Sequence, residues 1–533
     1  MTKETRANLE ALVSIGRGTT WMAIGSFLFL IFGFFGRLGV ARIVSVGAWG
    51  LFNIGISLAG FLSIVALLGL PQATARALSF ERDPWVRRAV VRQSLFFTSL
   101  DAAGVSIAVY LFAPALARVF SPASVGSLTQ VFELFSVLVG FTLMSSYLSA
   151  LFQGFERAQP NAWFTQILGP GLFVAFLALS FGLRLGFTGV LVAYVAAAAI
   201  AFVALLLYTL ARLPPVFTRP TGPPPLKISV PPDFWRLSLS LWGVSSLAFI
   251  MTFADTLILA VFWPATTVGL YSAATTFARL FLLVNGALAY IFLPVTARLA
   301  RGKAFRVIEW TYVTSTRWIV ALGIPLLFLF VFLPGQSLRE LFGGSYKAAA
   351  LPLQILTLGA FASVAVGPVN ACLAGLARSR TLLITSVVPA GANLLLSFTL
   401  IPRYGAMGAA VAWTVARLAN TGFGALALAW GNGISAFRRP LTLPLAVTFA
   451  IGIPVFAGMA LLQVPGWSIF PLAIGSFGLF LGASLVTRSL NRGDLLIVRA
   501  GERVLGRSLP TVRRFLERYM APDPLPSSPP LPE

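Results

Sequence analysis

A series of long apolar segments is the feature that most constrains this chain. A helix needs about 20 consecutive apolar residues to cross the hydrocarbon core of a bilayer. Because lipid offers the backbone no hydrogen-bond partners, such segments must fold as helices. We therefore predict an all-α polytopic membrane protein with about fourteen transmembrane helices. The predicted spans lie near residues 19–40, 48–70, 92–113, 128–152, 162–182, 187–211, 235–262, 268–293, 311–333, 351–376, 381–401, 405–430, 441–463 and 466–487.

The composition agrees with a lipid environment and removes several kinds of chemistry. Hydrophobic residues make up 58% of the chain and charged residues 10%, whereas a soluble protein carries about 25% charged residues. Histidine is absent, and Cys372 is the single cysteine. These counts exclude an internal disulfide, a Cys/His zinc site and a histidine general base. We expect no cofactor beyond a coupling ion, H⁺ or Na⁺.

The placement of cations explains the formal charge of +23 and orients the chain. If the N-terminus is inside, most Lys and Arg residues fall in inner segments, as Arg87, Arg301 and Arg438 do. The positive-inside rule then places both termini in the cytoplasm of a multi-pass cell-membrane protein. This explains the charge without a nucleic-acid partner. The outer loops are short, the longest near 334–350, so they leave no room for a catalytic domain and we predict no enzyme activity.

Two halves of the sequence resemble each other. Gly50-Leu51-Phe52 recurs as Gly269-Leu270-Tyr271, and Pro170 recurs as Pro389, both at an offset of 219 residues. Each half contains an even number of spans, so the copies should be related by an axis along the membrane normal. Two such bundles around a central cleft are typical of transporters, with the substrate near their interface.

The repeat divides the chain into five predicted parts. The two lobes of six helices are followed by two additional helices and a basic tail, and a Pro-rich cytoplasmic linker separates the lobes. The parts are 1–211 for the N-terminal lobe, 212–234 for the linker, 235–430 for the C-terminal lobe, 441–487 for the additional helices and 488–533 for the cytoplasmic tail.

Four segments also match a known family in their order and spacing. Ala41-Arg42-Ile43-Val44-Ser45-Val46-Gly47-Ala48-Trp49-Gly50-Leu51-Phe52 resembles the family pattern AR-x-L-x-x-x-x-(Y/F)-G-x-(F/Y) after the first helix. The stretch 68–76 resembles the end of its second helix. Ala254-Asp255 with 268–271 resembles the seventh-to-eighth helix signature, and 403–410 the turn before the twelfth helix.

The chain is thus similar to the oligosaccharide (Wzx-type) flippases of the multidrug/oligosaccharidyl-lipid/polysaccharide exporter superfamily. The resemblance implies two six-helix lobes in a V, alternating access, and a substrate of undecaprenyl- or dolichyl-diphosphate oligosaccharide. Trp49 stands where Tyr is commoner in the family and Val44 where Leu is. These departures weaken the assignment to any one subfamily and leave the fold expectation intact.

Ionisable residues inside predicted spans are the candidate functional groups, because burying a charge in lipid is costly. Arginine stays charged at any depth and binds phosphate through two hydrogen bonds. We therefore predict Arg37, Arg279 and Arg417 as substrate ligands for a diphosphate or an acidic sugar. The alternative for these arginines is pairing with carboxylates on other helices. Arg317 lies near the inner end of its span and is expected to extend to the interface.

The intramembrane carboxylates and amides supply two further predictions. Asp255, Asp101 and Glu133 are candidates for ion coupling, because a carboxylate in a cleft can bind H⁺ or Na⁺. Amides could hold sugar hydroxyls, and hydrogen bonding between helices is the alternative role for them. The amides predicted to bind substrate are Gln153, Asn370 and Asn393, with Gln166, Asn285 and Asn420 as further candidates.

Together these features favour a flippase for surface polysaccharide or glycan biosynthesis. Its substrate would be a polyprenyl-diphosphate-linked oligosaccharide, moved from the cytoplasmic to the outer leaflet by alternating access. The expected partners are this substrate, membrane lipids and glycan-assembly proteins, and the chain is expected to be a monomer. Alternatives are an ion-coupled multidrug exporter of the same superfamily, a lipid-II-type flippase, and a membrane-bound sugar polymerase or ligase.

Overall fold

The computed structural model describes residues 25–81, 83–155, 157, 159–213, 233–302, 304–462, 464–490 and 494. Within these residues the chain is helical and contains no strand, which confirms the predicted all-α fold class. Most of the predicted linker at 212–234 and of the basic tail at 488–533 lies outside the described residues.

The described chain forms two compact units. Unit 1 comprises the described residues of Met1–Thr276 with Leu341–Tyr346 and Ala390–Trp413. Unit 2 comprises those of Phe277–Glu340, Lys347–Pro389 and Thr414–Glu533. The unit boundaries fall inside α10, α15 and α16, so they do not follow the sequence repeat. The lobe boundaries drawn from the repeat stay a prediction.

Each predicted span coincides with helical structure in the described residues. The helices are Gly25–Ile43, α2 Val46–Leu67, α3 Leu70–Phe80, α4 Pro84–Phe120, α5 Val125–Gly154, η2 Asn161–Leu168, α6 Gly169–Gly182, α7 Gly186–Arg212, α9 Asp233–Phe262, α10 Ala265–Arg301, α11 Phe305–Phe332, α12 Pro334–Leu341, α13 Ala350–Ala365, α14 Val369–Gly375, α15 Ser379–Tyr404, α16 Ala406–Asn432, α17 Arg439–Leu461 and α18 Ile469–Val486, with short 3₁₀ turns at Pro122–Ser124, Gly344–Ala349 and Gly466–Ser468.

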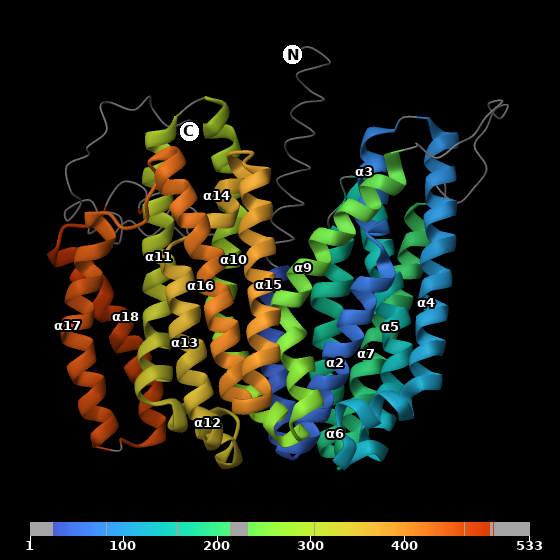
Figure 1. The fold of residues 1–533 in the computed structure, drawn as a ribbon, viewed down its shortest axis with the longest axis horizontal. Helices are drawn as coiled ribbons and strands as arrows, with labels where there is room; N and C mark the ends of the chain where they lie inside the picture. Colours follow the sequence, from blue (N-terminus) through green and yellow to red (C-terminus); the bar gives the residue numbers. More distant parts are fainter. Residues whose placement is uncertain are drawn as a thin grey trace. The chain divides into compact units, whose positions relative to one another are not determined.

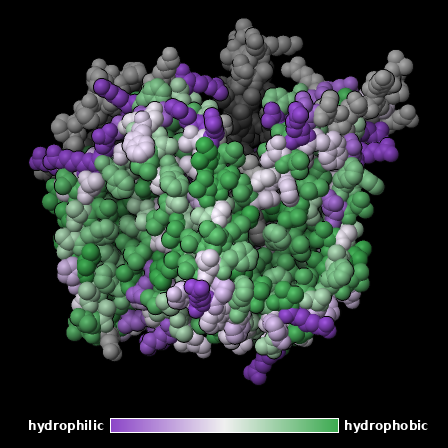
Figure 2. All heavy atoms as spheres, in the orientation of Figure 1, coloured by the Kyte–Doolittle hydropathy of each residue, from purple (hydrophilic) through white to green (hydrophobic). Residues whose placement is uncertain are grey.

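Twelve helical stretches of the described chain are long and apolar enough to cross a membrane. The helix pair Asp233–Leu247 and Ile250–Phe262, bent by 58°, would be a thirteenth span. The predicted twelfth span forms α16 but is not among these stretches. On the face shown in Figure 2, hydrophobic residues cover most of the surface between the helix ends. These features define a multi-pass membrane protein.

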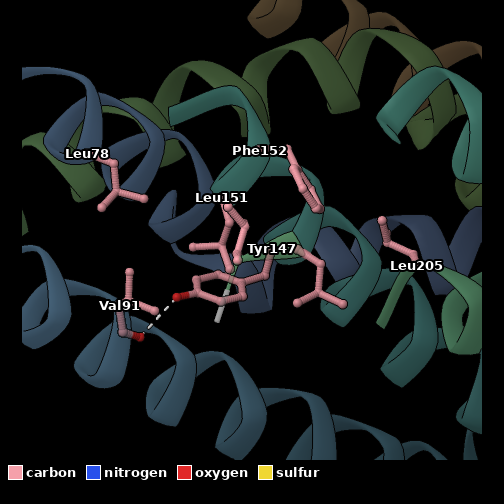
Figure 3. Close-up of a cluster of buried hydrophobic side chains, with 8 residues drawn as sticks. Leu78, Val91, Tyr147, Leu151, Phe152 and Leu205 are labelled. Carbon is pink, nitrogen blue, oxygen red and sulfur yellow. Dashed lines mark hydrogen bonds between the residues drawn. The ribbon is translucent and has the colours of Figure 1, made fainter. Parts of the chain in front are cut away.

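Unit 1 is organised around α5, which packs against α2, α3, α4 and α7 (Figure 1). A buried cluster at these contacts contains Leu78, Val91, Tyr147, Leu151, Phe152 and Leu205 (Figure 3). The hydroxyl of Tyr147 donates to the Val91 carbonyl oxygen at 3.0 Å and lies 2.9 Å from the Ser94 hydroxyl. The polar end of the tyrosine is therefore satisfied where its ring is buried.

The two glycines matched by the repeat contact each other's helices in unit 1. A Cβ at Gly50 of α2 would lie 1.8 Å from the carbonyl oxygen of Ala265 in α10. A Cβ at Gly269 of α10 would lie 2.1 Å from the carbonyl oxygen of Val46 in α2. Each glycine thus packs against the carbonyl oxygen of the residue four positions before the other glycine, so the contact is reciprocal. Only glycine allows backbones to approach this closely.

Unit 2 is organised around α11, which packs against α13, α17 and α18 (Figure 1). The additional helices α17 and α18, which lie outside the repeat, also pack against each other. Gly452 of α17 contacts the ring of Phe328 on α11, and a Cβ there would lie 2.4 Å from Cζ of that ring. The small residue allows α17 to pack closely against α11.

Candidate functional site

In unit 1, Asp255 is held in a fixed position on α9. The residue is 3% exposed. One carboxylate oxygen accepts a hydrogen bond from the hydroxyl of Tyr271 on α10. Its other oxygen accepts from the backbone N–H of Thr256 at 2.8 Å. These two donors fix the orientation of the carboxylate and stabilise its charged form. Its role in ion coupling stays a prediction.

Asp101 has a different environment on α4. The residue is half-buried, and its Oδ2 atom is buried with no hydrogen-bond partner among the described residues. Thr98, one turn earlier, is fully buried, and its hydroxyl likewise has no partner within the described chain. Such buried polar atoms are uncommon in proteins, so this face of α4 is also a candidate for ion coupling.

The other predicted residues of unit 1 lie on three helices. Arg37 is half-buried on the helix Gly25–Ile43 and acts electrostatically on the buried hydroxyl of Tyr194 on α7. Glu133 is half-buried on α5, and Gln153 is exposed near the end of the same helix. Asn393 on α15 is 1% exposed, and neither atom of its amide has a hydrogen-bond partner among the described residues. These positions leave their predicted roles untested.

In unit 2, the structure brings two predicted amides together. The amide nitrogen of Asn370 on α14 donates to the amide oxygen of Asn420 on α16 at 3.4 Å. The nitrogen of Asn420 donates to the carbonyl oxygen of Thr385 on α15 at 2.5 Å. Asn420 is buried, whereas Asn370 is exposed, so the cluster reaches the surface of the unit. The amides therefore do join helices, which was the alternative role considered for them.

Arg417 lies beside this amide cluster. It precedes Asn420 by three residues on α16, and residues at this spacing share one helix face. The residue is half-buried, and its carbonyl oxygen accepts from the Thr421 hydroxyl at 3.0 Å. Arg279 is half-buried on α10 in the same unit. We call Arg417, Asn420 and Asn370 the α16 polar cluster; it combines a guanidinium with two amides.

A break in the helix before Asn370 positions this cluster. The sequence predicted one span at 351–376, but the structure has α13 and α14 separated at Gly367-Pro368. Gly367 has φ +89°, and a Cβ there would lie 2.2 Å from the Thr316 hydroxyl. The hydroxyl of Tyr312 donates to the carbonyl oxygen of Val366, which the break frees from helical bonding. Discontinuous helices are common at transporter binding sites.

The prediction for Arg317 is wrong. Arg317 on α11 does not extend to the interface; it is 2% exposed and forms an ion pair with Asp494. Its guanidinium also donates to the carbonyl oxygen of Ser489, and the indole N–H of Trp318 donates to Asp494 at 2.8 Å. Sequence reasoning missed Asp494 because it lies after the last apolar segment. Asp494 is the first of five carboxylates in the tail, so the sequence carried no signal that singled it out.

The fold is similar to those of solved transporters of the MOP superfamily. A structure described as lipid II flippase MurJ in an inward closed conformation matches with a TM-score of 0.67 at 14% identity, covering 86% of this chain and 97% of the other. An inward-facing multidrug resistance MATE family transporter matches with a TM-score of 0.58 at 15% identity, covering 77% of this chain and 97% of the other. A MOP superfamily transporter from Pyrococcus furiosus matches with a TM-score of 0.53 at 16% identity, covering 78% of this chain and 94% of the other.

The sequence itself gives the family. It matches the profile described as polysaccharide biosynthesis protein over residues 15–300, more than half of its length. The chain therefore belongs to the polysaccharide biosynthesis protein family. No curated protein matches the sequence.

Proposed function

We propose that the chain is a flippase that moves a polyprenyl-diphosphate-linked oligosaccharide across the membrane in polysaccharide biosynthesis. The observation that carries this proposal is membership of a polysaccharide biosynthesis family by a chain with a transporter fold. A saccharide made on a lipid carrier has to cross the bilayer before surface assembly. Its diphosphate cannot enter hydrocarbon without compensating charge.

The α16 polar cluster supports this substrate class. Arg417 provides a permanent cation with two parallel N–H donors for phosphate oxygens. The exposed amide of Asn370 offers a donor and an acceptor of the kind that sugar hydroxyls need. A guanidinium within one turn of amides therefore suits a headgroup that joins a phosphate to a sugar. Alternating access, predicted from the sequence repeat, remains part of the proposal.

The test is translocation in reconstituted vesicles. A fluorescent lipid-diphosphate oligosaccharide is incorporated into vesicles with the full chain, and its arrival in the opposite leaflet is measured by quenching. A charge-assisted hydrogen bond contributes about 1.5–3 kcal/mol, so Arg417→Ala should slow translocation about tenfold or more at limiting substrate.

The matched control is Arg403→Ala, because Arg403 is exposed in the last turn of α15. This variant should translocate at the wild-type rate. A wild-type chain that moves no lipid-diphosphate oligosaccharide refutes the function. A fully active Arg417→Ala protein at normal abundance refutes only the assignment of Arg417 as a ligand of the diphosphate.

A further inference from the structure

A groove in unit 1 lies between α3 and the start of α9, and none of its lining residues belongs to the α16 polar cluster. It has a volume of about 520 Å³ and is formed by α3 and the first turns of α9. Helix α4 has 37 residues and at 1.5 Å per residue exceeds the roughly 30 Å hydrocarbon core. Its first turns carry Arg87, Arg88 and Arg92, so this charged end is expected to extend beyond the hydrocarbon. Helix α3 packs against α4 and ends shortly before it begins.

The groove has an apolar floor on a rigid base. Ala73, Ala77 and Leu237 line it, and Phe234 is 3% exposed beneath it. The Ser238 hydroxyl donates to the carbonyl oxygen of Leu68 at 2.6 Å, which fixes α9 on the turn before α3. This bond holds the groove's two walls together, so the groove is formed before any ligand binds.

Charges of both signs surround this apolar floor. Arg76 and Arg236 line the groove together with Glu81 and Asp233. The guanidinium of Arg76 lies 5.8 Å from the centre of the Phe80 ring, which orients it along the groove wall. Within the described part of the chain, no ion pair is recorded for Arg76, Arg236 or Asp233. The charges of Arg76, Arg236 and Asp233 are thus available to a ligand.

We propose that this groove binds the headgroup of a zwitterionic phospholipid with a primary ammonium, such as phosphatidylethanolamine. Guanidinium groups bind the phosphate through paired hydrogen bonds. The Asp233 carboxylate accepts N–H donors of the ammonium group, which choline lacks. The apolar floor takes the glycerol and the first methylenes of the acyl chains. An anionic headgroup fits less well, because the two carboxylates would repel it.

The position in the membrane explains how the ligand reaches the groove. The charged ends of α3, α4 and α9 are expected at the depth of the phospholipid headgroups, so the bilayer itself supplies the ligand. Phe80 is 77% exposed at the rim of the groove and offers an apolar surface to an acyl chain. Filling the groove would tie α3 to α9 in addition to the contacts between them.

The test measures lipid affinity for the full chain in detergent. The purified protein is delipidated and titrated with phosphatidylethanolamine, phosphatidylcholine or phosphatidylglycerol, and the bound fraction is read by native mass spectrometry. Phosphatidylethanolamine should bind about tenfold more tightly than the other two, since each charge-assisted contact corresponds to about one order of magnitude.

Three variants assign the contacts. Arg236→Gln should weaken phosphatidylethanolamine about tenfold, and Asp233→Asn should remove most of the preference over phosphatidylcholine. Both side chains are exposed, so both variants should fold normally. Arg92→Gln changes an exposed arginine of α4 that does not line the groove and should bind as wild type. Equal affinity for all three lipids, tighter binding of phosphatidylglycerol, or a preference that survives Asp233→Asn would overturn the proposal.

Discussion

At the scale of single residues, the ion pair between Arg317 and Asp494 is the feature with the clearest energetic consequence. Both residues are buried, at 2% and 0% exposed. Removing one partner leaves an uncompensated buried charge, which costs about 3–5 kcal/mol. Arg317→Met and Asp494→Leu should therefore each destabilise the protein strongly.

The double variant separates this electrostatic cost from a loss of packing. Arg317→Met with Asp494→Leu removes both charges, so it should be more stable than either single variant. Thermal unfolding in detergent, followed by tryptophan fluorescence, measures the three variants against wild type. Destabilisations that simply add would show that the two side chains do not act as a pair.

Asp255 allows a test of ion coupling. Asp255→Asn keeps the shape of the side chain and an acceptor for the Tyr271 hydroxyl, but it removes the group that gains and loses charge. If Asp255 binds the coupling ion, the translocation rate of this variant should no longer respond to an imposed H⁺ or Na⁺ gradient. Vesicles with and without a gradient give the comparison. An unchanged response in Asp255→Asn would contradict this role for Asp255 and leave Asp101 on α4 as the next candidate.

The residues of the candidate site could be selected from the sequence, but their contacts could not. Arg417, Asn370 and Asn420 were recognisable because polar groups are rare in apolar helices. Their grouping depends on the break at Gly367, which places α14 beside α16. Hydropathy does not encode such a break. The partner of Arg317 was missed for a related reason, because Asp494 folds back after the final apolar segment.

At the scale of helices, the length and order of the apolar segments were sufficient to predict the long helices, but not the short helices α3 and α12 between the predicted spans. The exceptions are interruptions within a segment. The predicted span 162–182 contains the π-helical stretch η2 before α6, and 48–70 ends at Leu67 because Leu68 and Gly69 both have positive φ. Lipid requires hydrogen-bonded backbone within a span, so the general pattern is predictable. Local turns depend on side-chain packing.

The reciprocal contact between Gly50 and Gly269 gives a prediction about two helices. Alanine at either position would place a Cβ about 2 Å from a backbone carbonyl oxygen, so α2 and α10 would have to move apart. Overpacking of this kind costs about 1–3 kcal/mol. Gly50→Ala and Gly269→Ala should each lower the melting temperature of the protein.

Gly33→Ala is the matched control for these substitutions. A Cβ at Gly33 meets nothing within 4 Å, and the residue lies inside the helix Gly25–Ile43. Alanine favours helix over glycine by about 1 kcal/mol, so this variant should be at least as stable as wild type. Equal melting temperatures for all three variants would mean that the α2–α10 contact contributes no packing constraint.

At the scale of the whole molecule, the orientation in the membrane is predicted from the distribution of cations alone. The sequence makes this directly testable, because Cys372 is the single cysteine and is buried. Cys372→Ala thus provides a cysteine-free background in which one accessible thiol can be placed at each side of the membrane.

Two positions discriminate between the orientations. Ser345→Cys lies in a predicted outer loop and Arg301→Cys in a predicted inner loop, and both residues are exposed. With both termini in the cytoplasm, a membrane-impermeant maleimide should label Cys at 345 in intact cells and Cys at 301 only after permeabilisation. The reverse pattern would invert the topology. The inner-leaflet origin of the substrate would then fail as well, since the predicted direction of transport depends on this orientation.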